Sequence, residues 1–259
     1  MTSTTATSPL DVRTTNPDDN GRHHQAAPPF TGGKNGEGVY QTIINQMPPH
    51  QHYVELFAGA GAIIKHKRPA AGLNVAIEAD ADTAARLHLT PPRQVRHADA
   101  FTFLTEHYAL LQSPDVLIYA DPPYPLQTRQ GRRYYALEMT DAHHARLLKI
   151  LTHARAMVLI SGYRCPLYDR ALPTWRRIDY RTMTRGGSPR IESLWCNFPQ
   201  PKVLHDYQFL GDDFRERERI HKLIRRWTRR LEAMPPLQRA ALLDALHGRP
   251  AGDPPVRQK

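Results

Sequence analysis

The stretch VLIYADPPYPL, residues 116–126, joins an apolar strand to a rigid polar end. Its first residues are β-branched, aliphatic or aromatic, a composition typical of a buried strand. Asp121 closes the strand, and Pro122 and Pro123 then restrict the backbone before Tyr124. This sequence is a poor turn into a second strand. We therefore expect a rigid ledge at one edge of a sheet, on which a flat ligand can lie.

Short β-rich segments alternate with helical ones on both sides of this strand. Strands are expected at 53–57, 75–79, 94–99, 116–121 and 156–163. Helices are expected at 60–67, 81–89, 100–111 and 140–154. Such alternation predicts a parallel sheet with helices on both faces. Segments 176–184 and 192–198 predict a late strand pair, so the expected fold class is α/β, a doubly wound, mostly parallel sheet with a late antiparallel hairpin and C-terminal helices.

Composition divides the chain into four parts. A disordered N-terminal tail is expected at 1–27, the α/β domain at 28–200, a basic helical extension at 201–248 and a second disordered tail at 249–259. The extension contains a helix, 213–234, with apolar residues along one stripe and arginines on the opposite face.

Charge and cysteine content limit the class of protein. Lys and Arg number 35 against 25 Asp and Glu, which gives a formal net charge of +10. This excess favours a polyanionic partner such as nucleic acid, although surface arginines can also serve solubility alone. The two cysteines, Cys165 and Cys196, are too few for a disulfide framework and suggest a reducing cytoplasm. No apolar run approaches the ~18 residues of a membrane helix, so no membrane partner is expected.

Acidic residues and glycines mark the expected ligand edge of the sheet. The first strand runs into FAGAGA, where Gly59 and Gly61 allow close approach of a ligand to the backbone. The next strands end in Glu78, Asp99 and Asp121. Glu78 follows Gly59 by 19 positions, near the spacing at which an acid meets a ribose. A helix cap is the alternative reading of Glu78 and Asp99. An acid-rimmed site suits a cationic adenosine derivative, and we expect S-adenosyl-L-methionine.

The ledge itself predicts the second substrate. The Asp121 carboxylate and the carbonyl that follows it form two neighbouring acceptors, which match the two hydrogens of an exocyclic amino group. The ring of Tyr124 can stack on a base, as aromatic residues do with bases taken out of a helix. We therefore expect a flipped-out base that carries an amino group.

Three motifs together resemble the Dam-type, DPPY-motif family of adenine-specific DNA methyltransferases. They are FTGGK at 30–34, FAGAG at 57–61 and DPPY at 121–124, and the resemblance covers about residues 29–199. It implies the methyltransferase variant of the doubly wound sheet, with 28–200 as the catalytic domain. It also implies that Phe30 and Lys34 close over the cofactor.

The resemblance assigns further roles to residues of the other two motifs and of the strand ends. Phe57, Gly59 and Gly61 would line the methionine end of the cofactor. Glu78 would hold the ribose and Asp99 the adenine amino group of the cofactor. The catalytic turn that holds the target base would consist of Asp121, Pro122, Pro123 and Tyr124.

The implied reaction is methylation of the N(6) amino group of a flipped-out adenine in double-stranded DNA. A monomer of bacterial or phage origin is expected, in the cytoplasm, with a cognate restriction endonuclease as a candidate partner. DNA methylation in a restriction-modification system is the corresponding biological setting.

The chain departs from the family in one respect. Dam-type enzymes usually carry a long recognition insertion before the DPPY motif, and neither 78–99 nor 99–121 has room for it. Recognition is therefore expected to be limited or unusual. The loops 127–135 and 184–190 are the expected DNA contacts, with the basic helix 215–230 as a third candidate. The arginines expected to bind DNA are Arg129, Arg132, Arg133, Arg185 and Arg190.

Other functions remain open at this point. The same ledge fits an adenine of RNA, the N(4) amino group of cytosine or a protein side-chain amide. A DNA-binding protein with a vestigial cofactor site is an alternative from another class. The His pairs at 23–24 and 143–144 lack the spacing and the acidic neighbours of a metal site, so no metal is expected.

Overall fold

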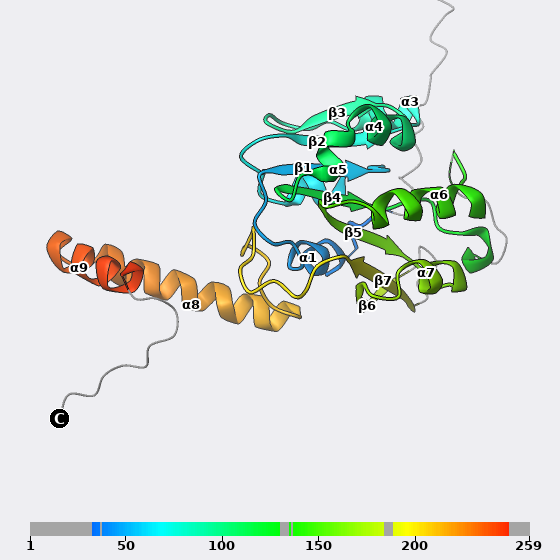
Figure 1. Ribbon diagram of the computed structural model, residues 1–259. Coiled ribbons are helices and arrows are strands. Elements are labelled where there is room, and N and C mark those ends of the chain that lie inside the picture. Colours follow the sequence, from blue (N-terminus) through cyan, green and yellow to red (C-terminus); the bar gives the residue numbers. More distant parts are fainter. Residues whose placement is uncertain (1–32, 37, 130–134, 136, 184–188, 249–259) are drawn as a thin grey trace, which may run out of the picture.

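The computed structural model describes residues 33–36, 38–129, 135, 137–183 and 189–248 (Figure 1). All structural statements below concern these residues. The two predicted tails, 1–27 and 249–259, lie outside them.

The described residues form a seven-stranded sheet in the order β3-β2-β1-β4-β5-β7-β6 (Figure 1). The strands are β1 His52–Leu56, β2 Asn74–Glu78, β3 Gln94–His97, β4 Val116–Ala120, β5 Met157–Gly162, β6 Arg176–Met183 and β7 Pro189–Cys196. Strands β1 to β5 are parallel, and β7 lies antiparallel between β5 and β6. The predicted fold class, a doubly wound sheet with a late antiparallel hairpin, is confirmed.

Helices cover both faces of the sheet. They are α1 Val39–Ile44, α2 Ala62–His66, α3 Ala81–Arg86, α4 Ala100–Glu106, α5 Tyr108–Gln112, α6 Asp141–Thr152 and α7 Pro166–Ala171. Strand β4 shows how its apolar run serves both faces. Ile118 packs in the core under α4 to α7, whereas Leu117 and Tyr119 pack in the core with α1 and α2. Every residue of β4 is therefore buried.

Strand order reverses between β1 and β4. From β1 the chain moves outward through β2 and β3, and it then returns to place β4 and β5 on the other side of β1. Ligands bind at such a switch point, beyond the carboxyl ends of the strands. The segments that leave these two strands are Phe57–Gly61 and Asp121–Tyr124, which are the segments that the sequence predicts for ligand binding.

Some helices differ from the expectation. The predicted helix 100–111 is divided into α4 and α5, because His107 has a non-helical backbone (φ −113°, ψ 39°). The sequence analysis did not assign α1 or α7. Helix α7 has a recognisable start signal, since Pro166 occupies the first turn after Cys165.

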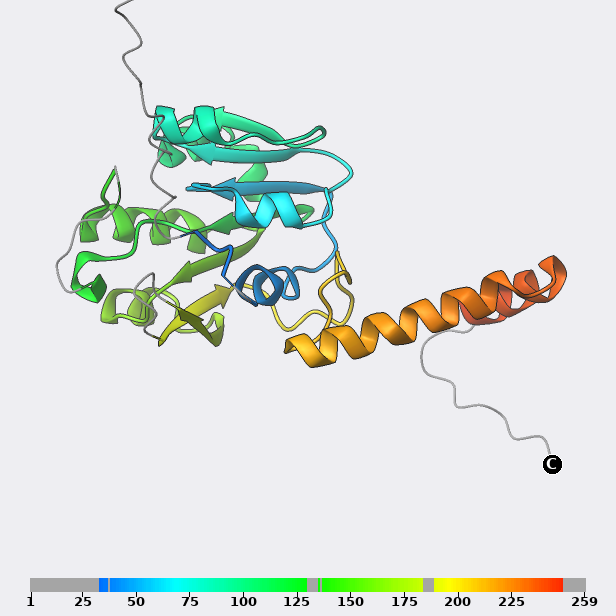
Figure 2. The same ribbon diagram turned by 180° about the vertical axis from the view of Figure 1, so that it is seen from behind.

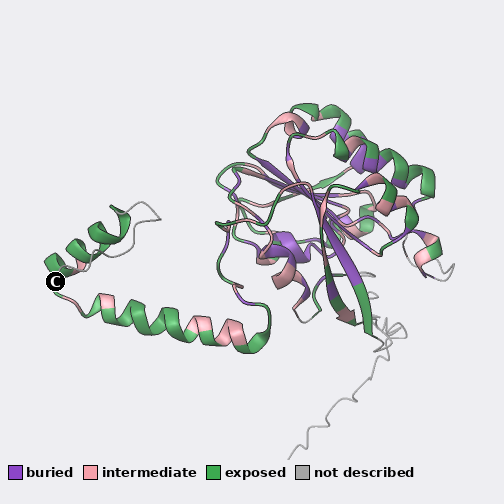
Figure 3. Ribbon diagram, turned by 60° about the horizontal axis from the view of Figure 1, so that its bottom comes forward, coloured by how far each residue is buried: buried purple, intermediate pink, exposed green. Residues whose placement is uncertain are grey.

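The C-terminal helices α8 (Phe214–Glu232) and α9 (Pro236–His247) extend away from the edge at which β1, β4 and β5 end (Figures 1 and 2). Neither helix contains a buried residue, and Figure 3 shows both in the colours of exposed and intermediate residues. The structure therefore does not bring the basic helix to the ledge. None of the helices in the described part of the chain combines the length and apolarity that a membrane crossing needs.

Candidate functional site

The Asp121 carboxylate is held by a lysine from a distant part of the chain. Lys34 Nζ lies 2.7 Å from each of the two carboxylate oxygens and donates to the Tyr124 hydroxyl at 2.6 Å. The side chains of Lys34 and Asp121 are only 6% and 17% exposed. Lys34 of the FTGGK motif thus meets Asp121 and Tyr124 of the DPPY motif at the sheet edge.

Glu192 of β7 completes this cluster. Its Oε2 atom accepts hydrogen bonds from the hydroxyls of Tyr124 (2.9 Å) and Tyr180 (3.1 Å), and it lies 3.6 Å from Lys34 Nζ. The late hairpin is therefore tied to the ledge. Sequence reasoning missed Glu192, although an acid within the otherwise apolar strand segment ESLWCNF was an available signal.

Burial and charge act in opposite directions within the cluster. Burial raises the pKa of Asp121 above its usual range, and the attraction of Lys34 opposes this rise. For Lys34, burial lowers the pKa, but Asp121 and Glu192 raise it by more, so the net shift is upward. Lys34 is therefore an ammonium at neutral pH, held between two buried carboxylates.

The turn after β1 is formed by residues with positive φ angles: Phe57 (59°), Gly59 (52°) and Gly61 (63°). The Gly59 N–H donates to Glu78 Oε2 at 2.8 Å, and the Asp80 N–H donates to Glu78 Oε1 at 3.0 Å. Glu78 therefore fixes the turn against the end of β2.

The two glycines of this turn have different surroundings. A Cβ atom added at Gly59 would meet open space, whereas one added at Gly61 would lie 2.7 Å from Leu87 Cδ1. Gly59 therefore presents bare backbone to a ligand. Gly61 allows the start of α2 to pack against Leu87.

We expect Gly61→Ala to lower the free energy of unfolding by about 3 kcal/mol, because the backbone strain of a positive φ adds to an overpacked contact. Gly59→Ala, which carries the strain without the contact, should cost only about 1 kcal/mol. Urea denaturation of both variants tests this difference. Equal losses at the two positions would contradict the assignment of Gly61 to packing.

Asp99 caps helix α4. Its Oδ1 atom accepts hydrogen bonds from the backbone N–H groups of Phe101 and Thr102, both at 3.0 Å. These contacts are those of a helix cap, which is the alternative role that the sequence allows for Asp99. Its Oδ2 atom forms no hydrogen bond within the described residues, and the side chain lies exposed at the carboxyl end of β3. A cofactor contact remains a proposal for Asp99.

The arginines expected to bind DNA fall into three groups. Arg129 is buried and pairs with Glu138, so in this conformation its guanidinium does not face a nucleic acid. The side chain therefore lies in the interior, and a DNA contact by Arg129 stays a prediction. Arg190 is exposed on β7. Arg132, Arg133 and Arg185 lie outside the described residues, as does Phe30 of the FTGGK motif.

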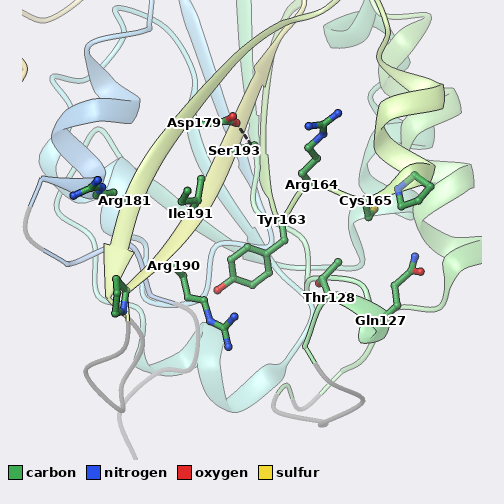
Figure 4. Close-up of a pocket in the computed structure, with 12 residues that line it drawn as sticks. Gln127, Thr128, Tyr163, Arg164, Cys165, Asp179, Arg181, Arg190, Ile191 and Ser193 are labelled. Carbon is green, nitrogen blue, oxygen red and sulfur yellow. Dashed lines mark hydrogen bonds between the residues drawn. The ribbon is translucent and has the colours of Figure 1, made fainter.

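A groove of about 1000 Å³ lies beside the ledge, between the β6–β7 hairpin, the β5–α7 connection and the 3₁₀ helix η1, Leu126–Arg129 (Figure 4). Tyr163 stands in this groove, and its ring meets the ring of Tyr124 edge-on, with centroids 4.8 Å apart. Arg164, Arg181 and Arg190 line the groove. The sequence analysis named only Arg190 among these residues.

Glu55 is a buried carboxyl behind the glycine turn. It accepts hydrogen bonds from the Ile64 N–H (2.7 Å) and the Tyr53 hydroxyl (2.9 Å). Burial raises the pKa of Glu55 from 4.5 to about 8, and the hydrogen bonds oppose this rise. Because the folded state holds the proton more tightly than the unfolded state, the stabilising effect is complete below pH 4.5 and is lost as the pH rises toward 8.

We expect Glu55→Gln to remove this part of the pH dependence. Between about pH 5 and pH 7 the wild-type protein should lose about 2–3 kcal/mol of unfolding free energy through Glu55, and the variant should not. This interval ends where Lys67 begins to titrate, since burial lowers the pKa of Lys67 to about 7. Urea denaturation across the interval is the measurement, with the exposed Glu106→Gln as control. Equal pH dependence in the wild type and Glu55→Gln would contradict the account.

No set of three His, Cys, Asp or Glu side chains in the described ranges comes together in a way that could hold a metal ion. The described site therefore consists of carboxylates, one buried lysine, bare glycine backbone and aromatic rings.

Among the comparisons with known proteins, only the one with solved structures found matches to this chain. No protein-family model matches the chain, and no curated protein matches it either. Among solved structures, the SAM-dependent methyltransferase from Agrobacterium tumefaciens aligns with a TM-score of 0.37 and 13% identity, over 61% of this chain and 58% of that one. A putative SAM-dependent methyltransferase from Streptococcus mutans aligns with a TM-score of 0.40 and 10% identity, over 61% and 47%.

A putative RNA methyltransferase from Pyrococcus horikoshii aligns with a TM-score of 0.38 and 11% identity, over 61% of this chain and 76% of that one. The chain spans only about half of the first two structures, at 58% and 47%. Likeness at this level does not identify a ligand or a substrate.

Proposed function

We propose that this chain is an S-adenosyl-L-methionine-dependent methyltransferase that modifies the N(6) amino group of adenine in DNA. The observation that carries the proposal is the position of the Asp121–Tyr124 turn at the switch point of the sheet, next to the glycine turn clamped by Glu78. One turn offers acceptors for an amino group, and the other offers open backbone and a carboxylate for a cationic nucleoside.

The residues of the glycine turn fit such a cofactor. The space beside Gly59 is open, and each Glu78 oxygen accepts only one hydrogen bond from the described backbone, so both retain a lone pair. The free Oδ2 atom of Asp99 offers a further acceptor at the same sheet edge. Bound there, S-adenosylmethionine would supply a methyl group on a positively charged sulfur.

The Asp121 turn would position the nitrogen that receives the methyl group. The carboxylate and the carbonyl after it accept the two amino hydrogens, which orients the nitrogen lone pair away from the ledge. In such a transfer the new C–N bond would form as the bond between the methyl group and the cofactor sulfur breaks, and the nitrogen would lose one proton. The Asp121 carboxylate would lie close to the point at which that proton is released, and burial raises its pKa. In the described state Lys34 donates to both carboxylate oxygens and the Tyr124 hydroxyl donates to Oδ1, so Oδ2 retains a lone pair for the target amino group.

We expect Glu78→Gln to weaken binding of S-adenosylmethionine by about 10- to 100-fold, because a partly buried charge-assisted contact is lost. Titration calorimetry measures the affinity directly, and circular dichroism verifies that the variant is folded. Asp82→Asn, an exposed acid in the first turn of α3, is the matched control. The same affinity for both variants would remove Glu78 from the cofactor site.

The net charge of +10 supports a nucleic-acid substrate, and the Asp of the DPPY turn supports adenine through the family resemblance. Incorporation of labelled methyl groups into plasmid DNA, single-stranded DNA and an RNA transcript tests the substrate class. DNA labelling is the expected result. Labelling of RNA alone would show that RNA, and not DNA, is the substrate. Binding of DNA without any labelling would favour a DNA-binding protein with a vestigial cofactor site.

A further inference from the structure

We propose that the groove beside the ledge holds the DNA strand that carries the target base, with Tyr163 as a stacking platform and Arg181 and Arg190 as phosphate contacts. This inference rests on the proposed function and identifies how the substrate strand reaches the Asp121 turn.

Tyr124 is poorly placed to receive a base from the groove. Tyr124 is only 5% exposed, and its hydroxyl forms hydrogen bonds with Lys34 and Glu192. Tyr163, at the end of β5, is partly exposed, and within the described part of the chain its hydroxyl forms no hydrogen bond. Its ring stands in the middle of the groove in Figure 4. The aromatic face that a nucleotide next to the target would meet is therefore that of Tyr163.

The hairpin wall of the groove carries the charge that a DNA strand requires. Arg181 of β6 and Arg190 of β7 are exposed, and neither forms an ion pair with another described residue. The acid of this wall is already engaged, since Asp179 accepts a hydrogen bond from Ser193 and pairs with Arg177. Arg181 and Arg190, which have no ion-pair partner among the described residues, can therefore bind the phosphates of a polynucleotide.

The opposite wall adds a third cation. Arg164 follows Tyr163 directly and lines the groove, where it is 62% exposed and paired with Asp169. Asp169 also pairs with Arg177, so one acid is shared by two arginines and does not cancel the positive charge of the groove. Basic side chains therefore stand on both sides of the aromatic ring.

The size and position of the groove favour a polymer over a separate small ligand. At about 1000 Å³ the groove is at the upper limit of small-molecule pockets. It adjoins the ledge at the Tyr124–Tyr163 ring contact, so a strand bound in the groove would lie next to a base held at Asp121. The strongly basic helix α8 points away from this edge, which leaves the groove as the described basic surface that adjoins the ledge.

Stacking on Tyr163 would stabilise a nucleotide next to the flipped base. Base–aromatic stacking tolerates any base, because each has a flat face. Arginines at phosphates likewise fix the register of the strand without reading its sequence. The groove therefore predicts that methylation depends only weakly on the sequence that flanks the target adenine.

The test compares variants of the full chain in three assays. Anisotropy titration gives the affinity for a fluorescein-labelled duplex that contains adenine, at several salt concentrations. Single-turnover methylation at saturating DNA gives the rate of the chemical step, and calorimetry gives the affinity for S-adenosylmethionine. Arg155→Gln, an exposed residue just before β5 and so at the opposite end of that strand from Tyr163, is the control.

Tyr163→Leu, which keeps apolar bulk but removes the flat face, should weaken DNA binding about tenfold or more. Tyr163→Phe should remain within about twofold of wild type, because its ring still stacks. Arg181→Gln combined with Arg190→Gln should reduce the slope of log affinity against log salt by nearly 2. Cofactor affinity should be unchanged in all of these variants and in the control.

The outcomes separate the two proposals. One outcome is that the wild type methylates DNA while the groove variants equal Arg155→Gln in DNA affinity and in salt slope. That result would overturn the assignment of the groove to DNA binding and leave the proposed function standing. Absence of methylation on DNA and RNA by the wild type would overturn the proposed function, and the groove assignment would fall with it. Equal losses in Tyr163→Phe and Tyr163→Leu would overturn the stacking role alone.

Discussion

Asp121→Asn will reduce the single-turnover methylation rate by at least about 100-fold, the scale of loss when a charge-stabilising group is removed from an active site. The variant retains the shape of the side chain but presents an amide N–H₂ where the base offers its own amino hydrogens. It also lacks the carboxylate that, in the proposed reaction, would lie close to the released proton. Affinity for S-adenosylmethionine should stay near that of the wild type, since Asp121 lies on the other turn of the site.

The control for this variant is Asp115→Asn, an exposed acid immediately before the amino end of the same strand, β4. Rates are compared well below the unfolding midpoint, because the substitution also removes the partner of Lys34. A rate within a few-fold of the control would show that Asp121 does not hold the reacting amino group.

Lys34→Met will lower the free energy of unfolding by about 3 kcal/mol at neutral pH, because it leaves Asp121 and Glu192 buried beside each other without their cation. The pKa of Asp121, already raised by burial, then rises further. A folded carboxyl with a raised pKa stabilises the fold at low pH and loses that effect as the pH increases. The destabilisation by Lys34→Met should therefore be smaller at about pH 4 than at about pH 7.

A double-mutant cycle tests the same interaction. Lys34→Met combined with Asp121→Asn should cost less than the sum of the single changes, with a coupling of about 1–3 kcal/mol. Lys149→Met, on the exposed face of α6, is the control for loss of a lysine. Additive effects, or a loss that does not depend on pH, would contradict the buried triad of charges.

The parallel part of the sheet could be predicted from sequence because each strand is a short apolar run followed by a helical segment. The β6–β7 hairpin was predicted less accurately. Strand β7 begins at Pro189, three positions before the predicted start at 192, because Pro189 to Ile191 pair with β6 along the ladder. The local sequence there indicates a turn, and tertiary pairing extends the strand.

The local turns of the site were accessible to sequence reasoning, and its long-range contacts were not. The Asp121–Tyr124 turn and the Gly59–Glu78 contact belong to recognisable strand ends. Glu192 reaches Tyr124 from 68 positions away, a proximity that only the antiparallel hairpin creates.

Arg129 lies in a basic loop that the sequence predicts to contact DNA. In the structure, pairing with Glu138 draws its side chain into the interior. Burial of a charged residue depends on a partner that its own position in the sequence does not reveal.

The most direct test of the central claim is the chemical identity of the product. Unmethylated DNA is incubated with the purified protein and S-adenosylmethionine, digested to nucleosides and analysed by mass spectrometry, with Asp121→Asn as the matched control. The account predicts N(6)-methyladenine in the wild-type reaction and little or none in the control. N(4)-methylcytosine alone would contradict the selection of adenine by Asp121, and the absence of any methylated nucleoside from both DNA and RNA would contradict the methyltransferase assignment itself.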